Sequence, residues 1–137
     1  MNNKIKQVER KLRQCKTQYV KPEQDWPQDI KNAVKFLEQH AFENSCSVRR
    51  MKERCEITQY TFTSRFTYYL GTPPSQFITA CRIKAAKMLL SDPDLQQVTV
   101  SEISFVIGYH SVSSFSTTFT YSVGIPPSIW RDRNLKN

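Results

Sequence analysis

Residues 66–77 have the sequence FTYYLGTPPSQF, and residues 119–130 repeat them as FTYSVGIPPSIW. The second copy begins 53 residues after the first, and at the same offset Phe62 corresponds to Phe115. Each copy has the pattern of a helix that ends at a glycine, Gly71 or Gly124, and of a new helix that starts at Pro-Pro-Ser. A short amphipathic helix and a turn precede each copy. The sequence therefore predicts two helix-turn-helix units.

Capping residues and apolar spacing place the helices around this repeat. In the first unit, we expect a helix from about Trp26 to His40 capped by Asp25, one from Val48 to about Cys55 capped by Ser47, and one from Gln59 to Leu70 capped by Thr58. A long helix is expected from Pro74 to about Leu90. In the second unit, we expect a helix that begins at Thr99 or Ser101, one capped by Ser111, and a short last helix that starts at the second Pro-Pro-Ser. No segment has the pattern of a strand, so the expected fold class is all-α.

The first 24 residues are the most basic part of the chain. They hold seven Lys or Arg and two Glu, in a chain whose net charge is +8. Ile5, Val8, Leu12, Cys15 and Tyr19 follow one another at steps of 3 and 4, which is typical of an amphipathic helix. The pattern favours a helical arm that packs on its own domain, or a frayed tail, over pairing of two chains through a short coiled coil.

Composition excludes several classes of protein. No window of about 18 apolar residues is present, so we expect no membrane span. The charged N-terminus does not resemble a secretory signal, which points to a cytoplasmic protein. The four cysteines form no C-x-x-C pair and both histidines stand alone, so no metal site and no cofactor are expected. No histidine lies in a nucleophile motif and no acidic pair is placed for acid–base chemistry, so we expect no catalytic residues and no enzyme.

The stretch VSEISFVIGYHS at 100–111, followed by Phe115, Phe119 and GIPPS at 124–128, closely resembles the signature of the AraC/XylS DNA-binding domain. The stretch from Gly71 to Leu90 is similar to the linking helix of that family. The resemblance covers about residues 28–133. It implies an all-α fold in which one long helix joins two helix-turn-helix lobes, each with a recognition helix for a major groove.

The charge of the arm and the resemblance together divide the chain, and the resemblance gives the base-facing residues. The arm is residues 1–24 and the DNA-binding domain is 25–133, with a first lobe at about 28–72, the linking helix at about 74–91 and a second lobe at about 99–133. The base-facing candidates are Gln59, Tyr60, Thr63 and Ser64 in the first lobe and Val112, Ser113, Ser114 and Thr117 in the second. Positive charge, and not the resemblance, marks the phosphate-contact candidates, which are Arg49, Arg50, Arg54, Arg65, Arg131, Lys4, Lys6, Arg10, Lys11 and Arg13.

The chain departs from the family pattern in its charges. Family members often carry Lys or Arg just after the recognition-helix Phe, where this chain has Thr67-Tyr68 and Thr120-Tyr121. Glu56 stands where the turn usually has Gly, so either Glu56 adopts a left-handed conformation at a cost of about 1 kcal/mol or the turn is rearranged. With Lys and Arg gathered in the arm and near Arg49, we expect the arm to follow the phosphate backbone.

Two functions follow as expectations. The first is a sequence-specific transcription regulator, an activator by family resemblance, that binds double-stranded DNA as a monomer or as a weak dimer through the arm. RNA polymerase is a further candidate partner. The second is a protein-interaction module on the same fold that has largely lost sequence-specific DNA binding. Salt-dependent binding to a duplex separates the two, because phosphate contacts release counterions.

Overall fold

A computed structural model describes residues 3–16, 23 and 25–135 of the chain. Every regular element in these residues is helical, and none is a strand, which confirms the all-α prediction. The elements in chain order are α1 (Asn3–Lys16), α2 (Gln28–His40), α3 (Val48–Arg54), α4 (Phe62–Leu70), α5 (Pro74–Leu90), the 3-10 turn η1 (Pro93–Leu95), α6 (Val100–Val106), α7 (Val112–Val123) and α8 (Pro127–Asn134).

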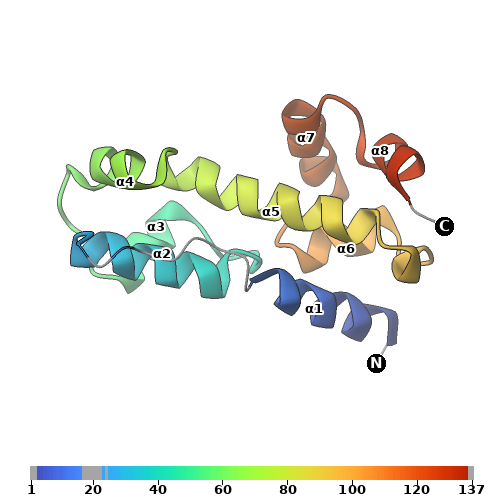
Figure 1. Ribbon diagram of the computed structural model, residues 1–137, viewed down its shortest axis with the longest axis horizontal. Helices are drawn as coiled ribbons and strands as arrows, with labels where there is room; N and C mark the ends of the chain where they lie inside the picture. The colour runs from blue at the N-terminus through green and yellow to red at the C-terminus, as the bar shows by residue number, and fades with distance from the viewer. Residues whose placement is uncertain (1–2, 17–22, 24, 136–137) are drawn as a thin grey trace.

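The long helix α5 is the axis of the molecule, as Figure 1 shows. The helices α2, α3 and α4 gather at its N-terminal end, and α6, α7 and α8 gather at its C-terminal end. In this view α4 and α7 lie along the upper edge, whereas α1 lies below α5 and contacts α5, α6 and η1. Each group of three helices around its end of α5 is called a lobe below.

The internal repeat of the sequence is also a repeat of packing. Phe66 meets Phe77 edge to face at 5.7 Å between ring centroids, and the equivalent Phe119 meets Trp130 in the same T-shaped way at 6.0 Å. Phe62 and Phe115, one helical turn earlier, are fully buried beside them. Buried aromatic pairs of this geometry add about 0.5–1.5 kcal/mol to the stabilisation from area alone. Each lobe thus has an aromatic core made of corresponding residues.

Several predicted helix ends are confirmed. Ser47 Oγ accepts a hydrogen bond from the backbone N–H of Arg50 at 3.0 Å, and Ser111 Oγ accepts one from Ser114 at 3.1 Å. The helix α6 begins at Val100 with Thr99, and not Ser101, as its cap, because Thr99 and Glu102 form a reciprocal capping box. The helices α4 and α7 end at glycines with φ of 79° and 99°, the left-handed conformation that terminates helices readily.

The predicted cap of α2 is wrong. The helix begins at Gln28, with Pro27 in the capping position and no side-chain cap. The backbone N–H of Lys31 donates to the carbonyl oxygen of Pro27 at 3.1 Å, which is the first bond of the helix. Asp25 stands two residues ahead of the capping position, so its carboxylate is not placed to accept from the first turn.

The predicted start of α4 is also wrong. The helix begins at Phe62 rather than Gln59, and neither Thr58 nor Thr61 provides a side-chain cap. Both lobes bury a residue after the left-handed turn, Ile57 in the first and Tyr109 in the second. Four residues then lead to Phe62, whereas five lead to Phe115. The shorter connection has no room for a capped first turn and closes through a bond from the N–H of Phe62 to the carbonyl of Gln59, 3.2 Å long.

The turn between α3 and α4 is not rearranged. Glu56 adopts a φ of 56°, and among the described residues it is the one non-glycine residue with positive φ. Gly108 occupies the equivalent turn of the second lobe with a φ of 113°. The first lobe therefore carries the left-handed strain of about 1 kcal/mol that the sequence predicted as one of two outcomes.

Candidate nucleic-acid interface

The two recognition surfaces occupy the faces of α4 and α7 that point away from the aromatic cores. All eight base-facing candidates are exposed, and they are Gln59, Tyr60, Thr63, Ser64, Val112, Ser113, Ser114 and Thr117. The side chain of Tyr60 is 97% exposed and that of Val112 is 39% exposed. Both helices lie along the same edge of the molecule in Figure 1. Their contact with bases stays a prediction.

The first surface differs from the second because of the late start of α4. Gln59 and Tyr60 lie in the turn ahead of the helix, so only Thr63 and Ser64 are held on a helical face. The side-chain oxygen of Gln59 accepts a hydrogen bond from Arg65 Nη2 at 3.1 Å, which draws Gln59 back toward the lobe. In the second surface, Val112, Ser113 and Ser114 form the first turn of α7, directly after the Ser111 cap.

Positive charge beside the first surface comes from α3. Arg49, Arg50 and Arg54 are exposed on this helix, and Arg49 has only a loose ion pair with Glu53 at 3.8 Å. An open groove of about 720 Å³ lies between α3 and the turn, lined in part by Arg49, Lys52 and Thr58. In helix-turn-helix proteins the first helix of the unit crosses the DNA backbone, which is the position that α3 holds here. These arginines therefore remain the strongest phosphate candidates.

Arg65 is occupied inside the first lobe. Its Nη1 and Nη2 atoms donate to the two carboxylate oxygens of Asp29 at 2.8 and 2.6 Å, and its Nε donates to Thr61 Oγ1 at 3.1 Å. The hydrogen bonds from Arg65 hold the pKa of Asp29 below its ordinary value, although partial burial acts in the opposite direction. A bidentate pair of this kind ties α2 to α4, so we assign Arg65 to the fold and leave it out of the phosphate set.

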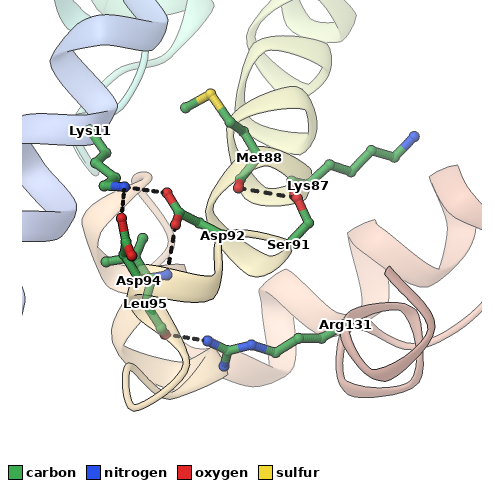
Figure 2. A network of polar contacts seen from close by, with 8 residues as sticks. All are labelled: Lys11, Lys87, Met88, Ser91, Asp92, Asp94, Leu95 and Arg131. Carbon is green, nitrogen blue, oxygen red and sulfur yellow. Dashed lines mark hydrogen bonds and ion pairs between the residues drawn. The ribbon is translucent and has the colours of Figure 1, made fainter. Parts of the chain in front are cut away.

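Arg131 is occupied in the same manner in the second lobe. Its guanidinium donates to the carbonyl oxygens of Val98 and Leu95, each at 2.6 Å. Figure 2 shows Arg131 reaching the segment after α5 from one side while Lys11 of α1 reaches it from the other. Both carbonyls belong to the connection between α5 and α6, where Leu95 ends the turn η1 and its carbonyl oxygen also accepts from the N–H of Val98 at 3.0 Å. We therefore also remove Arg131 from the phosphate-contact candidates.

The N-terminal arm packs against its own chain, as the apolar pattern favours. Val8 is fully buried and Leu12 is 6% exposed. Lys11 Nζ pairs with Asp92 at 2.6 Å and with Asp94 at 3.1 Å, and these contacts raise the pKa of Lys11. Lys4 lies 3.4 Å from Glu102. Tyr19, the last residue of the predicted stripe, lies outside the described residues.

The position of the arm argues against contact with the phosphate backbone. Figure 1 shows α1 and α7 on opposite sides of α5. Lys6, Arg10 and Arg13 are exposed, yet the helix that carries them lies across α5 from α7. Lys4 and Lys11 are held by carboxylates of the same chain. We therefore withdraw the five arm residues from the phosphate set.

Arg82 has a structural role that the sequence did not predict, since the sequence pattern placed this residue in the linking helix without assigning it a contact. Its Nε and Nη2 atoms donate to the carbonyl oxygens of Ala41 and Glu43, both at 2.8 Å, and its guanidinium lies 5.2 Å from the ring centre of Tyr109. It therefore joins the end of α2 in the first lobe to the turn of the second. No sequence pattern signals a contact between residues so far apart.

Other site types receive no support in the described part of the chain. No group of three His, Cys, Asp or Glu side chains in these ranges is arranged to hold a metal ion. No helix among the described residues is long and apolar enough to cross a membrane.

Comparison with known proteins identifies the fold that these features build. The family model described as "Helix-turn-helix domain" matches residues 51–133. The chain belongs to the AraC/XylS helix-turn-helix family. It therefore carries the DNA-binding domain of a family of transcription regulators. The match begins within α3 and ends within α8, so it includes both recognition surfaces.

Curated relatives are regulators of greater length. An uncharacterized HTH-type transcriptional regulator, YobQ, of Bacillus subtilis is 28% identical over 103 residues, which are 73% of this chain and 40% of YobQ. The MmsAB operon regulatory protein of Pseudomonas aeruginosa is 24% identical over 119 residues, which are 87% of this chain and 38% of that protein. The chain thus spans about two fifths of the length of these AraC/XylS relatives.

A solved structure supports the fold. The C-terminal domain of AraT, a response regulator from Geobacillus stearothermophilus, superposes with a TM-score of 0.74 at 18% identity and covers 82% of this chain and 91% of that domain. At this identity the likeness establishes the arrangement of the AraC/XylS lobes.

Proposed function

We propose that this AraC/XylS chain is a sequence-specific transcription regulator that inserts α4 and α7 into successive major grooves of double-stranded DNA. The observation that supports it best is the pair of exposed polar surfaces, built on corresponding positions of two repeated lobes and carried by α4 and α7, which lie along one edge of the molecule. A major groove admits one helix, and on one face of the duplex the grooves recur at about 34 Å. Two lobes fixed on α5 suit a site of about two helical turns.

In this proposal uncharged side chains make the contacts to the bases. The helix α7 contains no Lys or Arg, so the bidentate contact of arginine with guanine is not available to it. Ser113 and Thr117 offer single hydrogen bonds to base edges, and Val112 offers apolar contact to a thymine methyl group. Tyr60 combines a hydroxyl with an apolar ring in the first lobe. Arg49, Arg50 and Arg54 supply the electrostatic affinity through phosphates.

The arm and the family resemblance suggest the oligomeric state of the regulator and its effect on transcription. Because Val8 and Leu12 are buried within one chain, they are not available to pair two chains, and we propose a monomer on DNA. We propose an activator that contacts RNA polymerase through the exposed Lys6, Arg10 and Arg13 of α1, a helix that lies across α5 from α7. The proposal assigns no catalytic step to the chain.

A protein-interaction module is the second candidate, and exposed aromatic side chains favour it. Tyr68 and Tyr121 are 81% and 93% exposed, which the packing of the lobes does not require. Fluorescence anisotropy with a labelled random duplex, measured from low to physiological salt, separates the two. The regulator should bind with an affinity whose logarithm falls linearly with log salt concentration. Absence of duplex binding at low salt would contradict the regulator and support the interaction module.

A further inference from the structure

Two exposed tyrosines continue the recognition surfaces beyond the residues assigned above. Tyr68 and Tyr121 are 53 residues apart and occupy the same position of the repeat. Tyr68 lies four residues after Ser64, and Tyr121 lies four residues after Thr117, so each shares a helix face with a base-facing candidate. A large aromatic residue that is exposed at the same position in both lobes indicates a shared role.

The position along the helix indicates what these side chains meet. In α7 the exposed stripe runs through eight helical residues, from Ser113 to Tyr121, whereas in the first lobe its helical part runs from Ser64 to Tyr68 and Tyr60 lies in the turn ahead of α4. Eight helical residues rise by about 12 Å, and the major groove is about 12 Å wide. When the first turn of a recognition helix reaches base edges, the third turn on the same face reaches the wall of the groove. That wall is the phosphate backbone.

The surroundings of both side chains fit an uncharged contact. The ring of Tyr68 packs edge to face on Tyr69 at 5.0 Å, and Tyr69 packs on Trp26 at 5.6 Å, so the phenol is held outward at little entropic cost. Tyr121 borders an open groove of about 590 Å³ between α5 and α7. The groove is lined by Tyr121, Thr118, Ser122, Thr72, Gln76, Thr79 and Ala80, none of which is charged.

We propose that Tyr68 and Tyr121 are a matched pair of uncharged phosphate contacts, one for each lobe, whose hydroxyl groups donate to backbone phosphate oxygens. The inference rests on the proposed insertion of α4 and α7 into DNA. A neutral donor positions the helix without releasing the counterion that a lysine would release. The pair therefore sets the depth of both recognition helices while leaving the salt dependence of binding to the α3 arginines.

The test replaces each tyrosine with Phe and, separately, with Lys, and measures anisotropy titrations on a selected duplex and on a scrambled one across a range of salt. Tyr68→Phe and Tyr121→Phe should each weaken binding about two- to tenfold, by the same factor on both duplexes and with no change of salt slope. The Lys variants should bind and should steepen the slope by about 0.9 each. Thr117→Val is the matched control, because it should change the ratio between the duplexes.

The outcomes separate this inference from the function on which it rests. Phe variants that match the parent on both duplexes, or Lys variants that leave the slope unchanged, would overturn the phosphate assignment while the parent still binds DNA. A parent chain without salt-dependent duplex binding would instead remove the proposed function, and this inference with it. Thermal melts should be the same for parent and Phe variants, since both rings are exposed.

Discussion

The guanidinium of Arg82 lies directly over Gly108, so that a Cβ atom added to the glycine would stand 2.7 Å from Arg82 Cζ. Arg82 belongs to the linking helix, and Gly108 forms the left-handed turn of the second lobe with a φ of 113°. The same guanidinium is anchored to the first lobe through the carbonyls of Ala41 and Glu43. The absence of a side chain at Gly108 thus allows one arginine to hold both lobes.

Replacing Gly108 by alanine should destabilise the fold by more than the strain of its positive φ alone. We expect Gly108→Ala to lower the free energy of unfolding by about 2–3 kcal/mol, from backbone strain together with the displaced guanidinium. Gly124→Ala is the control, since its φ of 99° brings comparable strain but nothing lies within 4 Å of the added Cβ. Urea denaturation measures the free energy of unfolding of both variants. Equal reductions would show that the Arg82 side chain moves away from the added methyl group at no cost, which would contradict the expectation.

Removing the bridge should loosen the spacing of the lobes. Arg82→Met keeps an apolar side chain on α5 but cannot donate to either carbonyl, so the lobes should tolerate a wider range of separations. We expect the affinity of the parent to fall about tenfold or more when one base pair is inserted between the two half-sites, and that of Arg82→Met to fall clearly less. Binding titrations on the two duplexes measure this. The same spacing penalty for both proteins would rule out the bridging role.

The bidentate pair of Arg65 and Asp29 should make stability depend on acid pH. Because hydrogen bonds from Arg65 lower the pKa of Asp29, the folded chain binds this proton less readily than the unfolded chain does. The contribution is therefore complete above the ordinary aspartate pKa of about 4 and is lost as the pH falls through the lower folded value. Parent and Asp29→Asn should differ by about 1 kcal/mol at pH 6, and the difference should shrink toward pH 3 in denaturant titrations. A difference that grows on acidification would contradict the sign.

The charges of α3 and those of the arm should affect DNA binding differently. Changing Arg49 and Arg50 to Gln should flatten the salt slope by about 0.9 for each phosphate that is no longer neutralised. The triple change of Lys6, Arg10 and Arg13 to Gln removes more charge, yet it should alter the slope much less, because α1 lies across α5 from α7. All five side chains are exposed, so both variants should fold. A larger change of the salt slope in the arm variant than in the α3 variant would contradict this expectation and indicate that the arm contacts the phosphate backbone.

Local signals predicted most of the fold, and their failures have local causes. The repeat, the serine caps and the glycine ends located both lobes because each depends on residues near in sequence. Thr58 failed as a cap because the first lobe has one residue fewer between Ile57 and Phe62 than the second has between Tyr109 and Phe115. The difference in length predicts the loss of the cap only once Ile57 and Tyr109 are known to be the equivalent buried residues.

The charged residues show where sequence reasoning stops. Arg65 reaches Asp29 across 36 positions, and Arg82 reaches Ala41 across 41. Such partners leave no periodic trace, so an internal arginine and a phosphate-binding arginine have the same appearance in a sequence. The exposure of Tyr68 and Tyr121, in contrast, follows from helix phase, since both lie opposite the buried Phe residues of the repeat.

Selection of bound duplexes from a random library tests the central claim most directly, with the parent chain, Tyr60→Ala and Thr117→Ala run side by side. The parent should enrich two short blocks of preferred bases about 10 base pairs apart, centre to centre. Tyr60→Ala should relax the preference in one block only, and Thr117→Ala in the other only, each by about 1–3 kcal/mol at the affected position. A parent that enriches no motif, or variants whose profiles match the parent at every position, would contradict insertion of α4 and α7 into successive major grooves.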